Sequence, residues 1–243
     1  MMLHYRLFNV RFPNALMNGA RYLSANTKFE FHPNYRLLTK LPGVFSAHQI
    51  QNEQGLIAAS PHFARKHGGE IMNQFLDAIP DEYVKNTRAL DMVNKIDCRI
   101  HNLEPGDYPA QPGWHCDGSY SINNTLNTNN YIVCTFSDSD SDSNNTYGVS
   151  NTQFLKNKFT LFGEDPQLWE DLNAAIEKEQ PEIYTNHDGQ MIEFDSITPH
   201  RAQPATQPGW RMFVRMSMWP NIYSDDEGRL THTNNVYRAS SPD

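Results

Sequence analysis

The chain has 243 residues, a formal net charge of −8 and a sequence pI near 5.6. That length is enough for one domain with a sizeable buried interior, so we expect a single domain over residues 1–243, with a support region (1–94), a core (95–220) and an irregular tail (221–243). The acidic balance and the lack of a lysine- and arginine-rich run argue against duplex nucleic acid as a partner.

The three cysteines lie far apart in the sequence, at Cys98, Cys116 and Cys134. Because they form no CxxC pair, they are typical of free thiols in a reducing compartment. The N-terminal residues 1–8 contain polar side chains and no long apolar run. We therefore expect a cytoplasmic protein with no secretion signal and no membrane span.

The support region contains the first predicted helix. Up to residue 43 the chain is irregular and rich in turn-forming residues. From Glu70 to Ile79, apolar residues recur at helical spacing, and Pro80 ends the pattern. This pattern predicts one helix that supports the core.

Two strands are predicted next. Lys95–Leu103 alternates apolar and polar residues, as a half-buried strand does, and Tyr131–Phe136 is rich in β-branched and aromatic residues. Ser137–Asn145 is polar and of low complexity, which predicts a surface loop. Its aspartates resemble calcium ligands, but the turn glycine and terminal glutamate of an EF-hand loop are missing.

The last third of the chain contains a helix and three strands by the same criteria. Residues 165–180 have an apolar stripe that predicts a helix. Glu182–Tyr184 and Met191–Phe194 are predicted to pair as a hairpin, because Asp188–Gly189 between them is a strong hairpin signal. Arg211–Trp219 is the last predicted strand.

Two histidines and a carboxylate form a candidate metal site. His115 and Asp117 are two residues apart, so on an extended segment both side chains leave from the same side and can reach one ion. Cys116 should point the other way, and His200 follows a strand and a turn. Such a ligand set holds a ferrous ion on one face and leaves the opposite positions open. A lone H-x-D is a weak signal, but these surroundings favour the metal site.

Residues 96–219 resemble the Fe(II)- and 2-oxoglutarate-dependent dioxygenases. The signature of that family is H-x-D/E, a distal H and an arginine some ten or more residues beyond it. His115, Asp117 and His200 match the signature, and arginines follow 11 and 15 positions after His200. The resemblance implies a mostly β fold with supporting helices around a double-stranded β-helix (jelly-roll) core. It also implies Fe(II) on the three matching residues and 2-oxoglutarate as the cosubstrate.

Arginine suits the distal carboxylate of 2-oxoglutarate, because a guanidinium presents two parallel donors. Arg211 and Arg215 are four residues apart on a strand, so they share a face with Phe213. The offset of Arg211 resembles the sulfonate and phytanoyl-CoA branches and makes it the first choice, with Arg215 facing an anionic substrate. Yet Arg215–Ser217 resembles the R-x-S pair of other branches, and surface salt bridging would also explain either arginine. Thr152 resembles a threonine that helps to hold the cosubstrate in some members.

The implied reaction is hydroxylation of a small-molecule or protein substrate with dioxygen, releasing succinate and carbon dioxide. Trp114, Tyr120 and Trp210 are close in sequence to the proposed site and could wall the substrate pocket, although core packing explains them as well. Two alternatives stay open, a jelly-roll metal-binding module without turnover and a zinc hydrolase.

Overall fold

The computed structural model describes residues 28–117, 130–138, 148–162, 169–220, 228–231 and 237–238. This part of the chain is mostly β structure, in sheets that are almost entirely antiparallel. Its strands are β1 (Lys28–Phe31), β2 (Tyr35–Lys40), β3 (Val44–Phe45), β4 (Gly55–Ala59), β5 (Met92–Leu103), β6 (Asp107–Tyr108), β7 (Asn130–Asp138), β8 (Thr152–Leu155), β9 (Phe159–Phe162), β10 (Ile183–Thr185), β11 (Gln190–Asp195), β12 (His200–Ala202), β13 (Gly209–Pro220), β14 (Arg229–Thr231) and β15 (Tyr237–Arg238). Its helices are α1 (Ala47–Gln51), α2 (Pro61–His67), α3 (Glu70–Asp77), α4 (Asp81–Ala89) and α5 (Trp169–Glu179).

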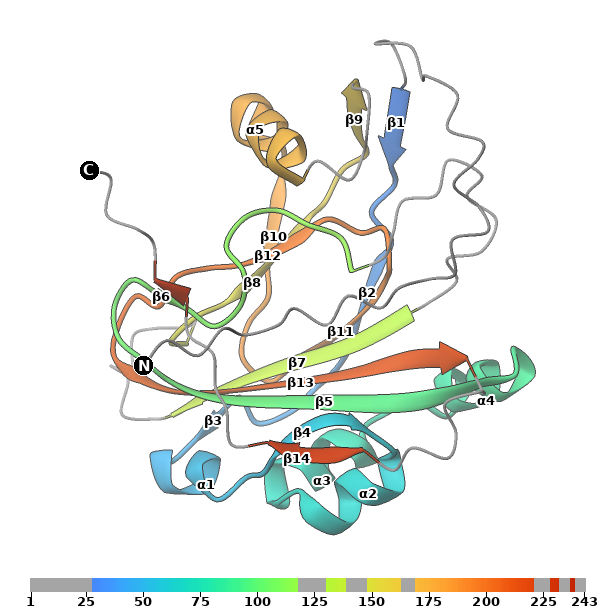
Figure 1. The fold of residues 1–243 in the computed structure, drawn as a ribbon, viewed down its shortest axis with the longest axis vertical. Coiled ribbons are helices and arrows are strands. Elements are labelled where there is room, and N and C mark those ends of the chain that lie inside the picture. Colours follow the sequence, from blue (N-terminus) through green and yellow to red (C-terminus); the bar gives the residue numbers. More distant parts are fainter. Residues whose placement is uncertain are drawn as a thin grey trace, which may run out of the picture.

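The large sheet has the strand order β14-β4-β5-β13-β7-β11-β2, with β3 beside β7 (Figure 1). Its central strand β13 pairs with β5 along its whole length and with β7 from Arg211 to Ser217. Side chains of a strand alternate between two faces. On β5 and β13 the even-numbered positions are apolar and buried, at Ile96, Cys98, Ile100, Met212, Val214 and Met216. The odd-numbered positions are largely polar and line a cavity on the opposite face, at Asp97, Arg99, His101, Arg211, Phe213 and Arg215.

Helices α1 to α4 cover the even-numbered face of the large sheet (Figure 1). Helix α3 contributes four buried apolar side chains to this core, Ile71, Met72, Phe75 and Leu76. The buried carboxylate of Glu53 holds the start of α3, accepting hydrogen bonds from the backbone N–H groups of Gly69 and Ile71 at 2.9 and 2.7 Å. These bonds satisfy donors that a helix start leaves unpaired. The helical layer therefore seals one face of the sheet.

The small sheet, β10-β8-β12, lies over the other face (Figure 1). A β-bridge between His115 and His200 adds the His115 segment to the β12 edge of this sheet. Aromatic side chains fill part of the space between the two sheets, among them Phe154 from β8, Phe194 from β11 and Phe213 from β13. On the outer side of the small sheet, Leu155 of β8 packs in one cluster with Leu172 and Ile176 of α5.

Most of the predicted elements are found where the residue patterns place them, with two exceptions. Strands β1 and β2 form in the segment before residue 43 that was expected to be irregular, and Ser137 and Asp138 of the predicted surface loop are buried at the end of β7. The helix predicted at 70–79 is α3, and the strands predicted at 95–103, 131–136 and 211–219 are β5, β7 and β13, each somewhat longer than predicted. The expected mostly β fold with supporting helices is therefore confirmed.

The hairpin predicted around Asp188–Gly189 is wrong. The strands on either side of it, β10 and β11, belong to different sheets, because β10 pairs with β8 and β11 pairs with β7 and β2. Gly189 does adopt a positive φ of 76°, but its N–H donates to the carbonyl of Thr135, and the buried Asp188 accepts from the Thr135 hydroxyl at 2.9 Å. The turn thus carries the chain from the small sheet to the large one.

Several sequence predictions fall on residues outside the described ranges. These are Tyr120, residues 139–145 of the predicted polar loop and the first residues of the helix predicted at 165–180, whose described part is α5. In the region expected to be an irregular tail, the structure describes β14, paired with β4, and β15, paired with β6. None of the helices in the described part of the chain is both long and apolar enough to span a bilayer.

Candidate metal centre

The structure brings the three predicted metal ligands together. One potential ligand atom from each of His115, Asp117 and His200 lies within 4.8 Å of the other two. The two histidines are held side by side by a pair of backbone hydrogen bonds, from His115 N to His200 O at 3.0 Å and from His200 N to His115 O at 2.9 Å. Asp117 Oδ2 lies 3.7 Å from His200 Nε2. Residues 83 positions apart in sequence thus form one cluster.

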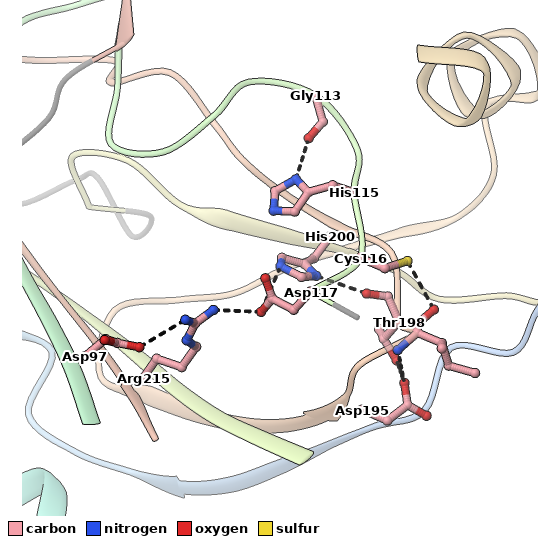
Figure 2. A network of polar contacts seen from close by, with 10 residues as sticks. Asp97, Gly113, His115, Cys116, Asp117, Asp195, Thr198, His200 and Arg215 are labelled. Carbon is pink, nitrogen blue, oxygen red and sulfur yellow. Dashed lines mark hydrogen bonds and ion pairs between the residues drawn. The ribbon is translucent and has the colours of Figure 1, made fainter. Parts of the chain in front are cut away.

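Both imidazoles are oriented to present Nε2 to an ion. His115 Nδ1 lies 3.0 Å from the carbonyl oxygen of Gly113, and His200 Nδ1 lies 3.0 Å from that of Thr198 (Figure 2). A carbonyl oxygen can only accept, so each Nδ1 carries a proton, and in the neutral ring Nε2 is then the nitrogen with a free lone pair. Ligand histidines in metalloproteins are commonly fixed in this way. The ring orientations therefore suit metal binding.

The protonation states of the cluster also suit a cation. Burial, partly opposed by the charge of Asp117, lowers the pKa of His200 to about 4, so its imidazole is neutral at physiological pH. Burial raises the pKa of the Asp117 carboxyl, but the charges of His200, Arg215 and His115 together lower it below its usual value. At neutral pH, where His200 is neutral, the permanent positive charge of Arg215 still lowers the pKa of Asp117. His200 thus offers a neutral imidazole and Asp117 a carboxylate, the forms in which these groups bind metals.

Arg215 is bound to a metal ligand. Its Nη1 donates to Asp117 Oδ2 and its Nη2 donates to Asp97 Oδ2, both at 3.0 Å (Figure 2). The guanidinium also lies over the Tyr131 ring, 5.4 Å from the centroid. Although burial lowers the pKa of Arg215, the two carboxylates raise it well above its usual value. With both terminal nitrogens engaged, Arg215 orients Asp117.

Arg211 is the more buried of the two predicted arginines and has no ion-pair partner among the described residues. It is only 3% exposed, and its Nε donates to the carbonyl of Ser150 at 2.8 Å. Burial lowers its pKa to about 10, with Asp188 acting in the opposite direction, so it stays charged at neutral pH. Thr152, at the start of β8, lines the same cavity. The terminal nitrogens of Arg211 thus remain available to an anion.

The cluster lines a cavity of about 310 Å³ between the two sheets. This volume lies at the lower end of the usual range for small-molecule sites. Its polar lining combines the three predicted ligands with Arg211, Arg215 and Thr152, and its apolar lining includes Val133, Phe154, Phe194 and Phe213.

Of the two roles left open for the tryptophans, pocket wall or core packing, the structure shows core packing where it describes them. Trp114 is buried in the cluster beneath α5, with the guanidinium of Arg201 4.7 Å from its ring centroid, and Trp210 packs against the core under the helices. Neither lines the cavity, whose aromatic walls come from the strands of both sheets. Cys116 does point away from the ligands as expected, and its Sγ lies 3.4 Å from the carbonyl oxygen of Ile197 (Figure 2).

Three cavity residues on β5, Asp97, Arg99 and His101, were not singled out by the sequence analysis. Asp97 completes the Arg215 cluster, and Arg99 lines the cavity beside it. The signal that could have found them is the alternation of β5 itself, because Asp97, Arg99 and His101 share the face that is opposite to Ile96, Cys98 and Ile100.

No family model and no curated protein matches the chain. Among solved structures, the one titled "Crystal Structure of EvdMO1" is similar over 76% of this chain and 55% of that chain, at 13% sequence identity and a TM-score of 0.35. The chain thus spans about half the length of that protein, and no inference about function is taken from a likeness of this size.

Proposed function

We propose that the protein is an Fe(II)- and 2-oxoglutarate-dependent dioxygenase that hydroxylates a small-molecule or protein substrate. The observation that carries the proposal is one cavity that combines a preorganised His115–Asp117–His200 cluster with a buried arginine, Arg211, that has no ion-pair partner among the described residues. Two imidazoles and one carboxylate are typical of non-haem iron oxygenases, which keep coordination positions open for cosubstrate and oxygen.

The strand order is consistent with a double-stranded β-helix, which we propose as the core of the fold. Strands β5, β13, β7 and β11 form one layer, and the His115 segment, β12, β8 and β10 form the facing layer in that order. From β5 the chain passes to the His115 segment, then to β7 and then to β8, and it changes layer at each step. It changes layer at each step again from β10 through β11 and β12 to β13. Such winding of eight strands into two packed sheets is the jelly-roll arrangement.

We assign the distal carboxylate of 2-oxoglutarate to Arg211 in preference to Arg215. Asp97 and Asp117 already neutralise Arg215, whereas the guanidinium of Arg211 keeps its terminal nitrogens for a ligand. Arg211 and Arg215 share one face of β13, two pleats apart, so the cosubstrate would extend along the strand from the metal ligands toward Arg211. Thr152 on the facing sheet is placed to contact it.

Bound Fe(II) and 2-oxoglutarate would supply the oxidative chemistry, in which one atom of dioxygen enters succinate, the other enters the substrate as a hydroxyl group, and carbon dioxide leaves. The chain itself orients and shelters the reactants. Gly113 and Thr198 fix the imidazoles, and Arg215 fixes the carboxylate of Asp117. Phe154, Phe194 and Phe213 give the cavity apolar walls that exclude water from one side of the site.

The proposal is tested by measuring metal and cosubstrate binding separately by calorimetry under anaerobic conditions. We expect one Fe(II) per chain, with 2-oxoglutarate binding only to the metal-loaded protein. His115→Ala and Asp117→Ala should abolish metal binding. Arg211→Gln should keep the metal and weaken 2-oxoglutarate binding by about tenfold or more, because a charge-assisted hydrogen bond contributes about 1.5–3 kcal/mol.

Arg65→Gln is the matched control, since Arg65 is an exposed arginine paired with Asp77 on the helical layer. It should leave both affinities unchanged. A metabolite screen that detects succinate release in the presence of Fe(II) and dioxygen then searches for the substrate. Tight binding of zinc without binding of Fe(II) or 2-oxoglutarate would exclude the oxygenase and favour a hydrolytic zinc site.

A further inference from the structure

The cavity contains more arginine than the metal and cosubstrate require. Within the described chain, three arginines and two aspartates line it. Arg215 pairs with both Asp97 and Asp117, so these three side chains together carry one negative charge. Arg99 and Arg211 have no carboxylate partner within ion-pair distance in the described residues. The cavity thus contains two cations that lack an ion-paired carboxylate among the described residues.

Arg99 and Arg211 occupy different environments. Arg211 is buried, while Arg99 is exposed to solvent although it also lines the cavity. In the β5–β13 register, Arg99 is opposite Phe213, which lies between Arg211 and Arg215 on the same face. Arg99 is therefore next to the proposed cosubstrate site and can also be reached from outside.

Two guanidinium groups that face one cavity repel each other. After burial, the charge of Arg99 contributes to the lowered pKa of Arg211, and only Asp188 opposes it. Like charges that face one cavity destabilise it and raise the local concentration of anions. This occurs in a chain whose overall net charge is −8, so the positive character belongs to the cavity and not to the surface in general.

Of the three arginines that line the cavity, Arg215 pairs with two carboxylates and the charge of Asp188 acts on Arg211. Arg99 has no carboxylate within ion-pair distance among the described residues. A ferrous ion and doubly ionised 2-oxoglutarate cancel in formal charge, so the proposed ligands supply no net counter-charge for Arg99. We propose that Arg99 binds the anionic group of a small organic acid, and that this acid is the prime substrate class. The inference rests on the proposed function and deepens it, and the cavity of about 310 Å³ favours a small molecule.

The test measures whether an acid binds near the metal while 2-oxoglutarate stays bound. Mn(II) replaces Fe(II) because its unpaired electrons speed the nuclear relaxation of nearby protons. The probes are three acid–amide pairs of increasing size: acetate and acetamide, benzoate and benzamide, 3-phenylpropionate and 3-phenylpropanamide. With protein saturated with Mn(II) and 2-oxoglutarate, we expect at least one acid to bind about tenfold more tightly than its amide and to show metal-enhanced relaxation.

Variants assign the effect to Arg99. Arg99→Gln should abolish the preference for the acid and leave 2-oxoglutarate affinity within about twofold of the parent. Arg99→Lys, which keeps the charge, should retain most of the preference. Arg229→Gln is the matched control, because Arg229 is an exposed strand arginine away from the cavity.

The possible failures are distinguishable. If 2-oxoglutarate binds normally but no acid is preferred over its amide, or if Arg99→Gln keeps the preference, the role of Arg99 is wrong and the proposed function stands. Acids that displace 2-oxoglutarate instead of binding beside it would also overturn the second anion site. If 2-oxoglutarate itself fails to bind to the metal-loaded protein, the proposed function fails and this inference fails with it.

Discussion

Arg211 and Arg215 show how two identical side chains on one strand face acquire different roles. Arg215 meets two carboxylates, one of which is a candidate metal ligand, whereas Arg211 meets only a backbone carbonyl. The sequence predicts that both arginines share one face of the strand, because their spacing requires it. It does not reveal their partners, because Asp97 approaches from a strand more than a hundred residues away in sequence.

The Arg215 cluster should be detectable as an energetic coupling in the metal-free protein. Arg215→Gln leaves two partly buried carboxylates without their cation and should lower the free energy of unfolding by about 3 kcal/mol. In the double variant with Asp97→Asn the loss should be smaller than the sum of the single losses, by about 1 kcal/mol or more. Urea denaturation of the parent, the two single variants and the double variant measures this coupling.

The exposed pair Arg65–Asp77 provides the reference cycle, since both of its side chains are at least half exposed. Its coupling should be at most about 0.5 kcal/mol, because solvent and salt screen such pairs. Equal couplings in the two cycles would show that Arg215 contributes no more than an ordinary surface charge.

Among the secondary-structure elements, the turn at Gly189 connects the two sheets that enclose the site. An added Cβ at Gly189 would lie 2.3 Å from the carbonyl oxygen of Leu41, and φ at this residue is 76°. Glycine is therefore required for two reasons, the left-handed conformation and the close approach of another backbone segment.

Gly189→Ala should lower the free energy of unfolding by about 3 kcal/mol, because backbone strain and overpacking add. Gly106→Ala separates the two effects, since Gly106 has φ 91° but nothing within 4 Å of an added Cβ. Gly106→Ala should lower the free energy of unfolding by only about 1–2 kcal/mol. Denaturant midpoints measure both, and equal losses would mean that the contact with Leu41 relaxes at no cost.

The elements differ in how well the sequence predicts them. Strands β5, β7 and β13 and helix α3 are long and periodic, so local pattern and burial agree. Strands such as β4, β8 and β12 have three to five residues and depend on pairing with distant segments. The hairpin around Asp188–Gly189 was predicted wrongly for the same reason, dependence on distant segments. The residues of a turn act locally, whereas the choice of partner strand depends on the packing of both sheets.

The grouping of His115, Asp117 and His200 was predicted better than the short strands around it. Spacing placed His115 and Asp117 together, and the turn before β12 placed His200. For Arg99 the alternation of β5 is the one local signal, and it is weak because exposed arginines on strands are common. The aromatic walls were also missed, since proximity in sequence to a ligand does not decide which face a tryptophan occupies. Trp114 adjoins His115 and still faces α5.

At the scale of the whole molecule, a metal ion should stabilise the fold. The ligands come from the His115 segment and from β12, which are joined by a single bridge, so an ion would add a second link between them. Mn(II) at a hundred times its dissociation constant should raise the free energy of unfolding by about 2.7 kcal/mol, and EDTA should reverse the gain. The Asp117→Asn variant should show no such gain in the same urea titrations, and a gain equal to that of the parent would place the ion elsewhere.

The alternation along β13 has a further consequence for how the chain can change during evolution or design. In the middle of this strand the odd positions 211, 213 and 215 line the cavity, and the even positions 212, 214 and 216 pack against the helical layer. Inserting or deleting one residue within β13 would exchange the two sets, burying arginines under the helices and exposing methionines to the cavity. Substitutions can therefore adjust the pocket one side chain at a time, but changes of length are tolerated only outside this strand, in the connecting loops.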